Sequence, residues 1–95
     1  PNQSGWLTPQ WRGRFERAPA IYRVLAGAGW SALADTGHRR DTVLIGDTAP
    51  KGLRSRGVKR FLTPLAFVRA LYCVARSLHR LRGAAASGRG CPVGA

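Results

Sequence analysis

The apolar run Thr42-Val43-Leu44-Ile45 lies between two longer segments with helical spacing, and this order constrains the fold more than any other feature. A short, continuously apolar run with β-branched residues is typical of a strand that is covered on both faces, as in a parallel sheet. A helix, a buried strand and a second helix in succession are the α/β alternation. We therefore predict an α/β fold in the order loop, helix, strand, loop, helix.

The first helix is predicted over about Pro19–Thr36. Proline suits a first helical position, because the N–H that it lacks has no partner there in any case. Apolar side chains then recur at helical spacing, at Ile21, Leu25, Ala28 and Ala32. Gly37 is placed where a left-handed residue would end the helix.

The second helix is predicted to begin after Thr63 as the N-cap, with Pro64 in the first position. Apolar residues follow on one side, and the helix is expected to end near Gly83. The stretch from Ala84 to Ala95 is small and rich in glycine, which predicts a flexible tail or linker.

Two further segments read as loops. Pro1–Arg17 combines turn-forming residues with aromatic anchors, which predicts a long ordered loop. Gly46–Lys59 is rich in glycine and basic residues, so we expect it to be an exposed excursion after the strand.

A formal net charge of +12 raises a second class of function. Such a charge attracts phosphate and other anions, so a small basic nucleic-acid-binding module is an alternative. The arginines are scattered, however, and carry no RNA-recognition, zinc-finger or zipper signature. A partner-binding helical hairpin is a third possibility. No cofactor or metal site is expected, and no run approaches the roughly 18 apolar residues of a membrane span.

The opening Pro1-Asn2-Gln3 resembles the end of the Asn-Glu-Pro-Asn motif that closes the fourth barrel strand in clan A glycoside hydrolases, the cellulase-like and xylosidase-like enzymes. Ile45-Gly46-Asp47-Thr48-Ala49-Pro50 is similar to the end of the fifth strand of bacterial members, and Leu71-Tyr72-Cys73 and Gly90-Cys91-Pro92 also resemble this group. The resemblance implies that residues 1–95 are one segment of a (β/α)8 barrel, which needs about 250 residues when complete.

The resemblance also implies the chemistry, which is hydrolysis of O-glycosidic bonds in poly- or oligosaccharides. The family's general acid/base would lie directly before Pro1, and its nucleophile belongs to a later strand. We therefore expect no catalytic residue in this chain and no activity in isolation. Without its neighbours the predicted strand exposes both edges, so marginal stability or self-association is expected.

Four residues are candidates for contact with the carbohydrate: Asn2, Trp6, Trp11 and Asp47. Asn2 belongs to the motif, and tryptophan offers a broad face on which a sugar ring can stack. Anchoring of the loop in the core is the more ordinary role for both tryptophans. Asp47 follows the predicted strand directly and would face the cleft of a barrel, although capping of the next loop explains it equally well.

Cys73 and Cys91 are candidates for a disulfide that ties the second helix to the tail. Such a bond would suit a secreted protein, while two free thiols are equally compatible with the sequence.

Overall fold

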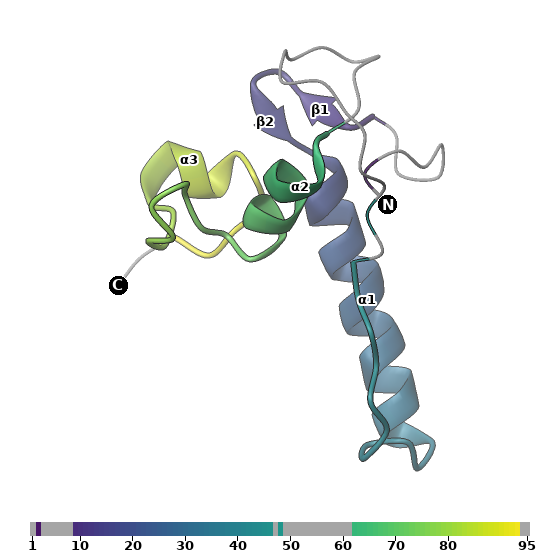
Figure 1. Cartoon of the computed structure of the whole chain (residues 1–95). Coiled ribbons are helices and arrows are strands. Elements are labelled where there is room, and N and C mark those ends of the chain that lie inside the picture. The colour runs from purple at the N-terminus through teal and green to yellow at the C-terminus, as the bar shows by residue number, and fades with distance from the viewer. Residues whose placement is uncertain (1, 3–8, 47, 49–61, 94–95) are drawn as a thin grey trace.

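A computed structural model describes residues 2, 9–46, 48 and 62–93. The elements are, in chain order, β1 (Trp11–Arg12), β2 (Phe15–Glu16), α1 (Ala18–Asp35), α2 (Pro64–Leu71) and α3 (Gly83–Ser87). α2 packs against the first part of α1, and the far half of α1 projects away from the other elements (Figure 1). Helices and a small sheet are thus both present, and the sheet within the described ranges has two antiparallel strands.

β1 and β2 form a hairpin inside the segment that the sequence predicts to be a long ordered loop. Trp11 pairs with Glu16 and Arg12 with Phe15, which leaves Gly13 and Arg14 as the two turn residues. Gly13 has a φ of +59°, and a glycine with positive φ in the first turn position is the arrangement of a type II′ hairpin. The hairpin points Glu16 toward the C-terminal part of the chain.

The prediction of the first helix is confirmed, since α1 spans Ala18–Asp35. Gly37 has a φ of +91°, and the N–H of His38 donates to the carbonyl of Leu33 at 2.9 Å. This bond from the second residue beyond the cap back to the helix is the Schellman motif. The left-handed stop that the sequence indicated at Gly37 is therefore present.

α2 begins as predicted, with Thr63 as N-cap and Pro64 in the first position, but it ends at Leu71. The prediction of a helix that continues to about Gly83 is wrong. Cys73 adopts a φ of +59°, and the N–H of Val74 donates to the carbonyl of Arg69 at 3.0 Å. A Schellman motif thus closes α2 at a cysteine, where glycine is the usual residue.

The guanidinium of Arg23 on α1 explains why α2 stops there. Its Nη2 donates to the carbonyl oxygen of Ala70 at 2.7 Å, and its Nε donates to that of Leu71 at 3.0 Å. In a longer helix those two oxygens would accept the N–H groups of Val74 and Ala75. Arg23 takes their place, so the last turn of α2 is satisfied from another element.

The chain after α2 folds back on itself. Val74 and Arg80 form an isolated antiparallel bridge, and the N–H of Ala75 donates to the carbonyl of His79 at 2.9 Å. α3 follows, and the N–H of Cys91 donates to the carbonyl of Ala86 at 2.9 Å. The segment after Ala84, which the sequence predicts to be a flexible tail or linker, thus contains most of α3 and a disulfide-bonded cysteine in its described part up to residue 93.

The core lies where the hairpin, the first turn of α1 and α2 meet. Its buried apolar members are Trp11, Ala18, Leu62, Phe67 and Leu71, with Ile21 and Tyr22 packed against them. The rings of Tyr22 and Phe67 meet edge to face with 5.8 Å between their centroids. The buried residues of α1 all belong to its first turn, so most of this helix lies outside the core.

The run Thr42–Ile45 does not form the buried strand that the sequence predicts. It has no strand partner among the described residues, and the exposed fractions of Val43, Leu44 and Ile45 are 45, 91 and 49%. The chain passes alongside the far half of α1, and the hydroxyl of Tyr22 accepts the N–H of Gly46 at 3.0 Å (Figure 1). Neighbours on both sides are needed to bury such a strand, and the described chain supplies α1 alone.

Arg23→Gln is expected to destabilise the fold by about 2 kcal/mol, because it removes charge-assisted hydrogen bonds to two helix carbonyls. Arg23→Lys should recover part of the loss, since a single ammonium replaces the planar fork. Urea unfolding of each variant measures the effect. Arg12→Gln, at an exposed arginine of the hairpin, is the control and should change stability by less than about 0.5 kcal/mol. Equal losses for Arg23→Gln and Arg12→Gln would contradict the assignment.

Gly88→Ala and Gly27→Ala should have opposite effects on thermal stability. A Cβ at Gly88 would lie 2.4 Å from two ring carbons of Phe15, which costs about 1–3 kcal/mol through overpacking. A Cβ at Gly27, inside α1, meets nothing within 4 Å, so alanine should stabilise the helix by about 0.5–1 kcal/mol. Thermal melting monitored by circular dichroism distinguishes the two, and a shift of both midpoints in the same direction would refute this packing.

Candidate functional site

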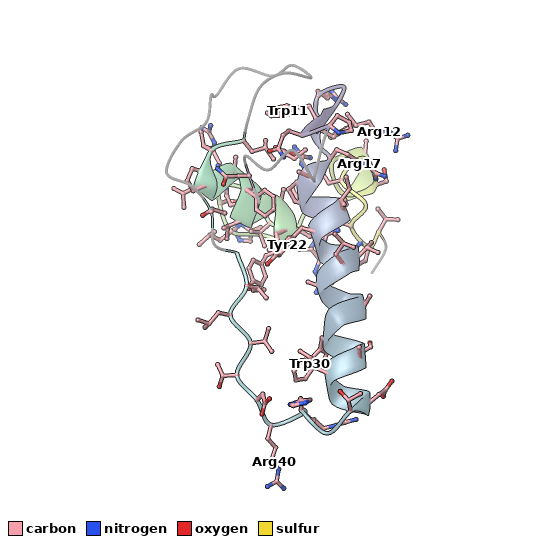
Figure 2. All side chains as sticks on the ribbon, turned by 90° about the vertical axis from the view of Figure 1, so that its right-hand side faces the viewer. Trp11, Arg12, Arg17, Tyr22, Trp30 and Arg40 are labelled. Carbon is pink, nitrogen blue, oxygen red and sulfur yellow. A yellow bond between two sulfur atoms is a disulfide. The ribbon has the colours of Figure 1, made fainter. Side chains whose placement is uncertain are left out.

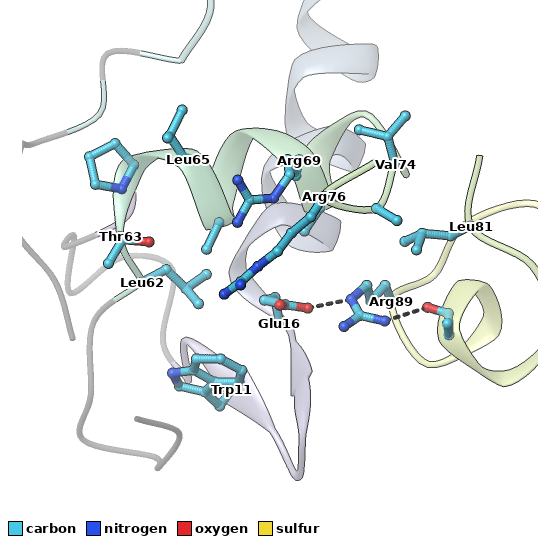
Figure 3. Close-up of a pocket in the computed structure, with 15 residues that line it drawn as sticks. Trp11, Glu16, Leu62, Thr63, Leu65, Arg69, Val74, Arg76, Leu81 and Arg89 are labelled. Carbon is cyan, nitrogen blue, oxygen red and sulfur yellow. Dashed lines mark hydrogen bonds and ion pairs between the residues drawn. The ribbon is translucent and has the colours of Figure 1, made fainter. Parts of the chain in front are cut away.

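A cleft of about 770 Å³ is the best candidate for a site in the described part of the chain. β1 and β2, α2, the turn after α2 and α3 all contribute to its lining. Figure 3 shows Arg69 on one side, Trp11 and Glu16 on the other, and the side chain of Arg76 extending between them. The volume falls in the range of about 300–1,000 Å³ that small-molecule sites occupy.

Glu16 and Arg89 form an ion pair at one end of the cleft. The Nε of Arg89 donates to Oε2 of Glu16, and both side chains are mostly buried. Nη1 of Arg89 donates to the carbonyl of Ala85 at 2.8 Å, and the guanidinium also lies 5.1 Å from the ring centre of Phe15. Arg89 therefore has three fixed contacts, and its guanidinium neutralises the carboxylate of Glu16.

The rest of the cleft is basic and apolar. Arg69 and Arg76 line it and make no ion pair with any described acid. The apolar part of the lining includes Trp11, Leu62 and Leu81. Glu16 is the one carboxylate among the described lining residues, so the cleft carries a surplus of positive charge.

Asn2 and Trp11, two of the predicted carbohydrate contacts, are structural in this fold. Asn2 is fully buried, and its Nδ2 donates to the carbonyl of Leu62 at 2.8 Å. Trp11 is 6% exposed and belongs to the core, although its edge reaches the cleft. The anchoring role that the sequence offered as the alternative for Trp11 therefore describes that residue in this structure, because little of its ring is exposed.

Trp6 and Asp47, the other two predicted contacts, lie outside the described residues. So does almost all of the predicted loop Gly46–Lys59.

Cys73 and Cys91 form the disulfide that the sequence allowed, with 5.9 Å between their Cα atoms. The bond joins the end of α2 to the segment after α3, beside Arg23. Nη2 of Arg23 lies 3.8 Å from Sγ of Cys91, and its Nη1 donates to the carbonyl of Gly90 at 3.3 Å. Desolvation lowers the pKa of Arg23 below its ordinary value, because burial among these groups penalises the cation.

Glu16 does not form a catalytic pair with Asp35 or Asp41. Glu16 precedes α1, whereas Asp35 ends it and Asp41 binds His38 beyond it. An 18-residue helix is about 27 Å long, while the two carboxyl groups of a glycosidase lie about 5–9.5 Å apart. Figure 2 shows how far the end of α1 near Arg40 lies from the hairpin at Arg12.

The described residues contain no group of three or more histidine, cysteine, aspartate or glutamate side chains that could hold a metal ion. No described helix combines the length and the apolar character that crossing a membrane requires.

The sequence did not single out Arg69, Arg76 or Arg89 as site residues. The seven-residue spacing of Arg69 and Arg76 was the available signal, because it places two side chains on one helical face. The helix ends between them, and the fold-back of the following segment brings the second one to the cleft. Their position at the cleft with Glu16 and Trp11 depends on contacts between distant parts of the chain.

Comparisons of the chain with protein-family models, with curated proteins and with solved structures found no match.

The Cys73–Cys91 disulfide is expected to stabilise the fold by about 3 kcal/mol, because it closes a loop over a sequence separation of 18 residues. Urea unfolding with and without reductant measures this contribution. The double variant Cys73→Ser/Cys91→Ser is the matched control and should be insensitive to reductant. Alkylation followed by mass spectrometry checks the bond itself, and labelling of both cysteines in the unreduced native protein would exclude it.

Proposed function

We propose that this chain is part of a glycoside hydrolase of the clan A type, which hydrolyses O-glycosidic bonds in poly- or oligosaccharides, and that it is inactive by itself. Two sets of residues support this: the resemblance of Pro1-Asn2-Gln3 to the end of the catalytic motif, and that of the segment from Ile45 to Pro50 to the end of the following strand.

The observation that carries the proposal is the resemblance of Pro1-Asn2-Gln3 to the end of the catalytic motif. The composition of the run Thr42–Ile45 also suits a barrel strand, although its exposure in the described chain counts against that role. Burial of one large aliphatic side chain contributes about 1.5–3 kcal/mol, so three exposed ones leave a large stabilisation unused. A strand of a (β/α)8 barrel has neighbours along both edges and cover on both faces. Thr42–Ile45 has the composition for that environment, and under the proposal adjacent strands of the barrel supply it.

The barrel architecture also indicates where the substrate would bind. In a barrel the active site lies at the carboxyl ends of the strands, which is where Gly46 and Asp47 follow the run. The carbohydrate would therefore lie beyond Ile45, and Trp6 and Asp47 are residues of this chain proposed to contact it.

The proposal also accounts for the arrangement of acids. Glycoside hydrolysis uses two carboxyl groups on either side of the scissile bond. Glu16 is occupied by Arg89, and Asp35 and Asp41 lie near the far end of α1. The general acid/base and the nucleophile are then supplied by residues outside this chain.

Expression of the complete open reading frame that encodes this chain tests the proposal. We expect a Glu codon directly before Pro1 and hydrolysis of aryl glycosides by the full product. Replacement of that Glu by Gln should lower kcat by at least about 100-fold, because proton transfer to the leaving group is lost. Asp35→Asn, at an exposed residue, is the matched control and should leave kcat unchanged.

The isolated 95-residue chain should hydrolyse none of these substrates. A reading frame with no carboxylate beside Pro1, or a full product without glycosidase activity, would overturn the proposal.

A further inference from the structure

The cleft that contains Arg69 and Arg76 is separate from the run Thr42–Ile45 and from the chemistry proposed above. Neither guanidinium has an acidic partner within the described ranges, although both line the same cleft. Arginine is fully charged at neutral pH, so two such groups that border one cleft repel each other. An anion between them would turn this repulsion into attraction.

The charge of the cleft sets the charge of the ligand. Glu16 is already bound by Arg89 and cancels that one guanidinium. The described acids Asp35 and Asp41 lie near the far end of α1 and do not line the cleft. Arg69 and Arg76 therefore leave a net charge of about +2, which matches the charge of about −1.5 to −2 on a phosphate monoester at pH 7.

The apolar part of the lining indicates that the ligand also has an apolar body. Leu65, Val74 and Leu81 line the same cleft as the arginines, and each of the three is at least partly exposed (Figure 3). A bare inorganic anion would use the guanidinium groups and leave these surfaces unused. A molecule with an apolar body beside its anionic group would cover both, and arginine can bind a phosphate with two parallel N–H bonds.

The geometry points to a binding site for a small dianionic organic molecule with an apolar body, such as a phosphate monoester of an aromatic group, held by Arg69 and Arg76 beside Leu65, Val74 and Leu81. Glu16 and Arg89 hold one end of the cleft in place.

Isothermal titration of the full chain with phenyl phosphate tests this site, with inorganic phosphate and phenol as probes of each half. Phenyl phosphate is expected to bind at least about tenfold more tightly than either, because only it uses both the guanidinium groups and the apolar lining. Equal affinity for phenyl phosphate and inorganic phosphate would overturn the role of the apolar lining and with it the proposal.

Two variants locate the binding. Arg69→Gln and Arg76→Gln should each weaken phenyl phosphate binding by about tenfold, the effect of losing one charge-assisted contact. Arg40→Gln removes the same charge from an exposed residue near the far end of α1 and should change affinity by less than about twofold (Figure 2). Circular dichroism establishes that all three variants are folded. An equal loss in Arg40→Gln would assign the binding to the diffuse charge of +12 and overturn the site.

Discussion

The guanidinium of Arg23 is the contact on which the described fold depends most. It bonds to the carbonyls of Ala70 and Leu71 from α1, and so it joins the two helices and ends the second one. It also reaches Gly90 and Cys91, where the disulfide returns the chain to the end of α2. The guanidinium of Arg23 carries several donors in a fixed plane, so it can link α1 to the end of α2 and to the segment after α3. A lysine in the same place has a single ammonium group and could not make all of these bonds.

This contact decides where the cleft lies. With α2 ended at Leu71, the next segment folds back and brings Arg76 beside Arg69, and α3 then places Arg89 on Glu16. A helix that continued beyond Leu71 would instead have carried the chain away from the hairpin at 1.5 Å per residue. The basic cleft is therefore a consequence of how one helix ends.

The apolar surface is distributed unevenly. The core lies at the hairpin, the first turn of α1 and α2. Val24 and Leu25, near the middle of α1, and the run Thr42–Ile45, beside its far half, remain exposed. A second hollow of about 530 Å³, lined largely by apolar and aromatic side chains such as Trp30, lies along this region. Apolar surfaces of this kind are typical of regions that contact further protein.

The sequence by itself determined the local features: α1 with its stop at Gly37, the start of α2 at Pro64, and the possibility of the disulfide. Proline, glycine and helical spacing act through neighbouring residues, so they can be read along the chain. Only the tertiary structure decided that α2 ends at Leu71 and that Thr42–Ile45 lies exposed. Both outcomes depend on partners distant in sequence. The end of α2 depends on Arg23, which donates to carbonyl groups 47 and 48 residues further along the chain. The burial of a strand depends on neighbouring strands and on elements that cover its faces.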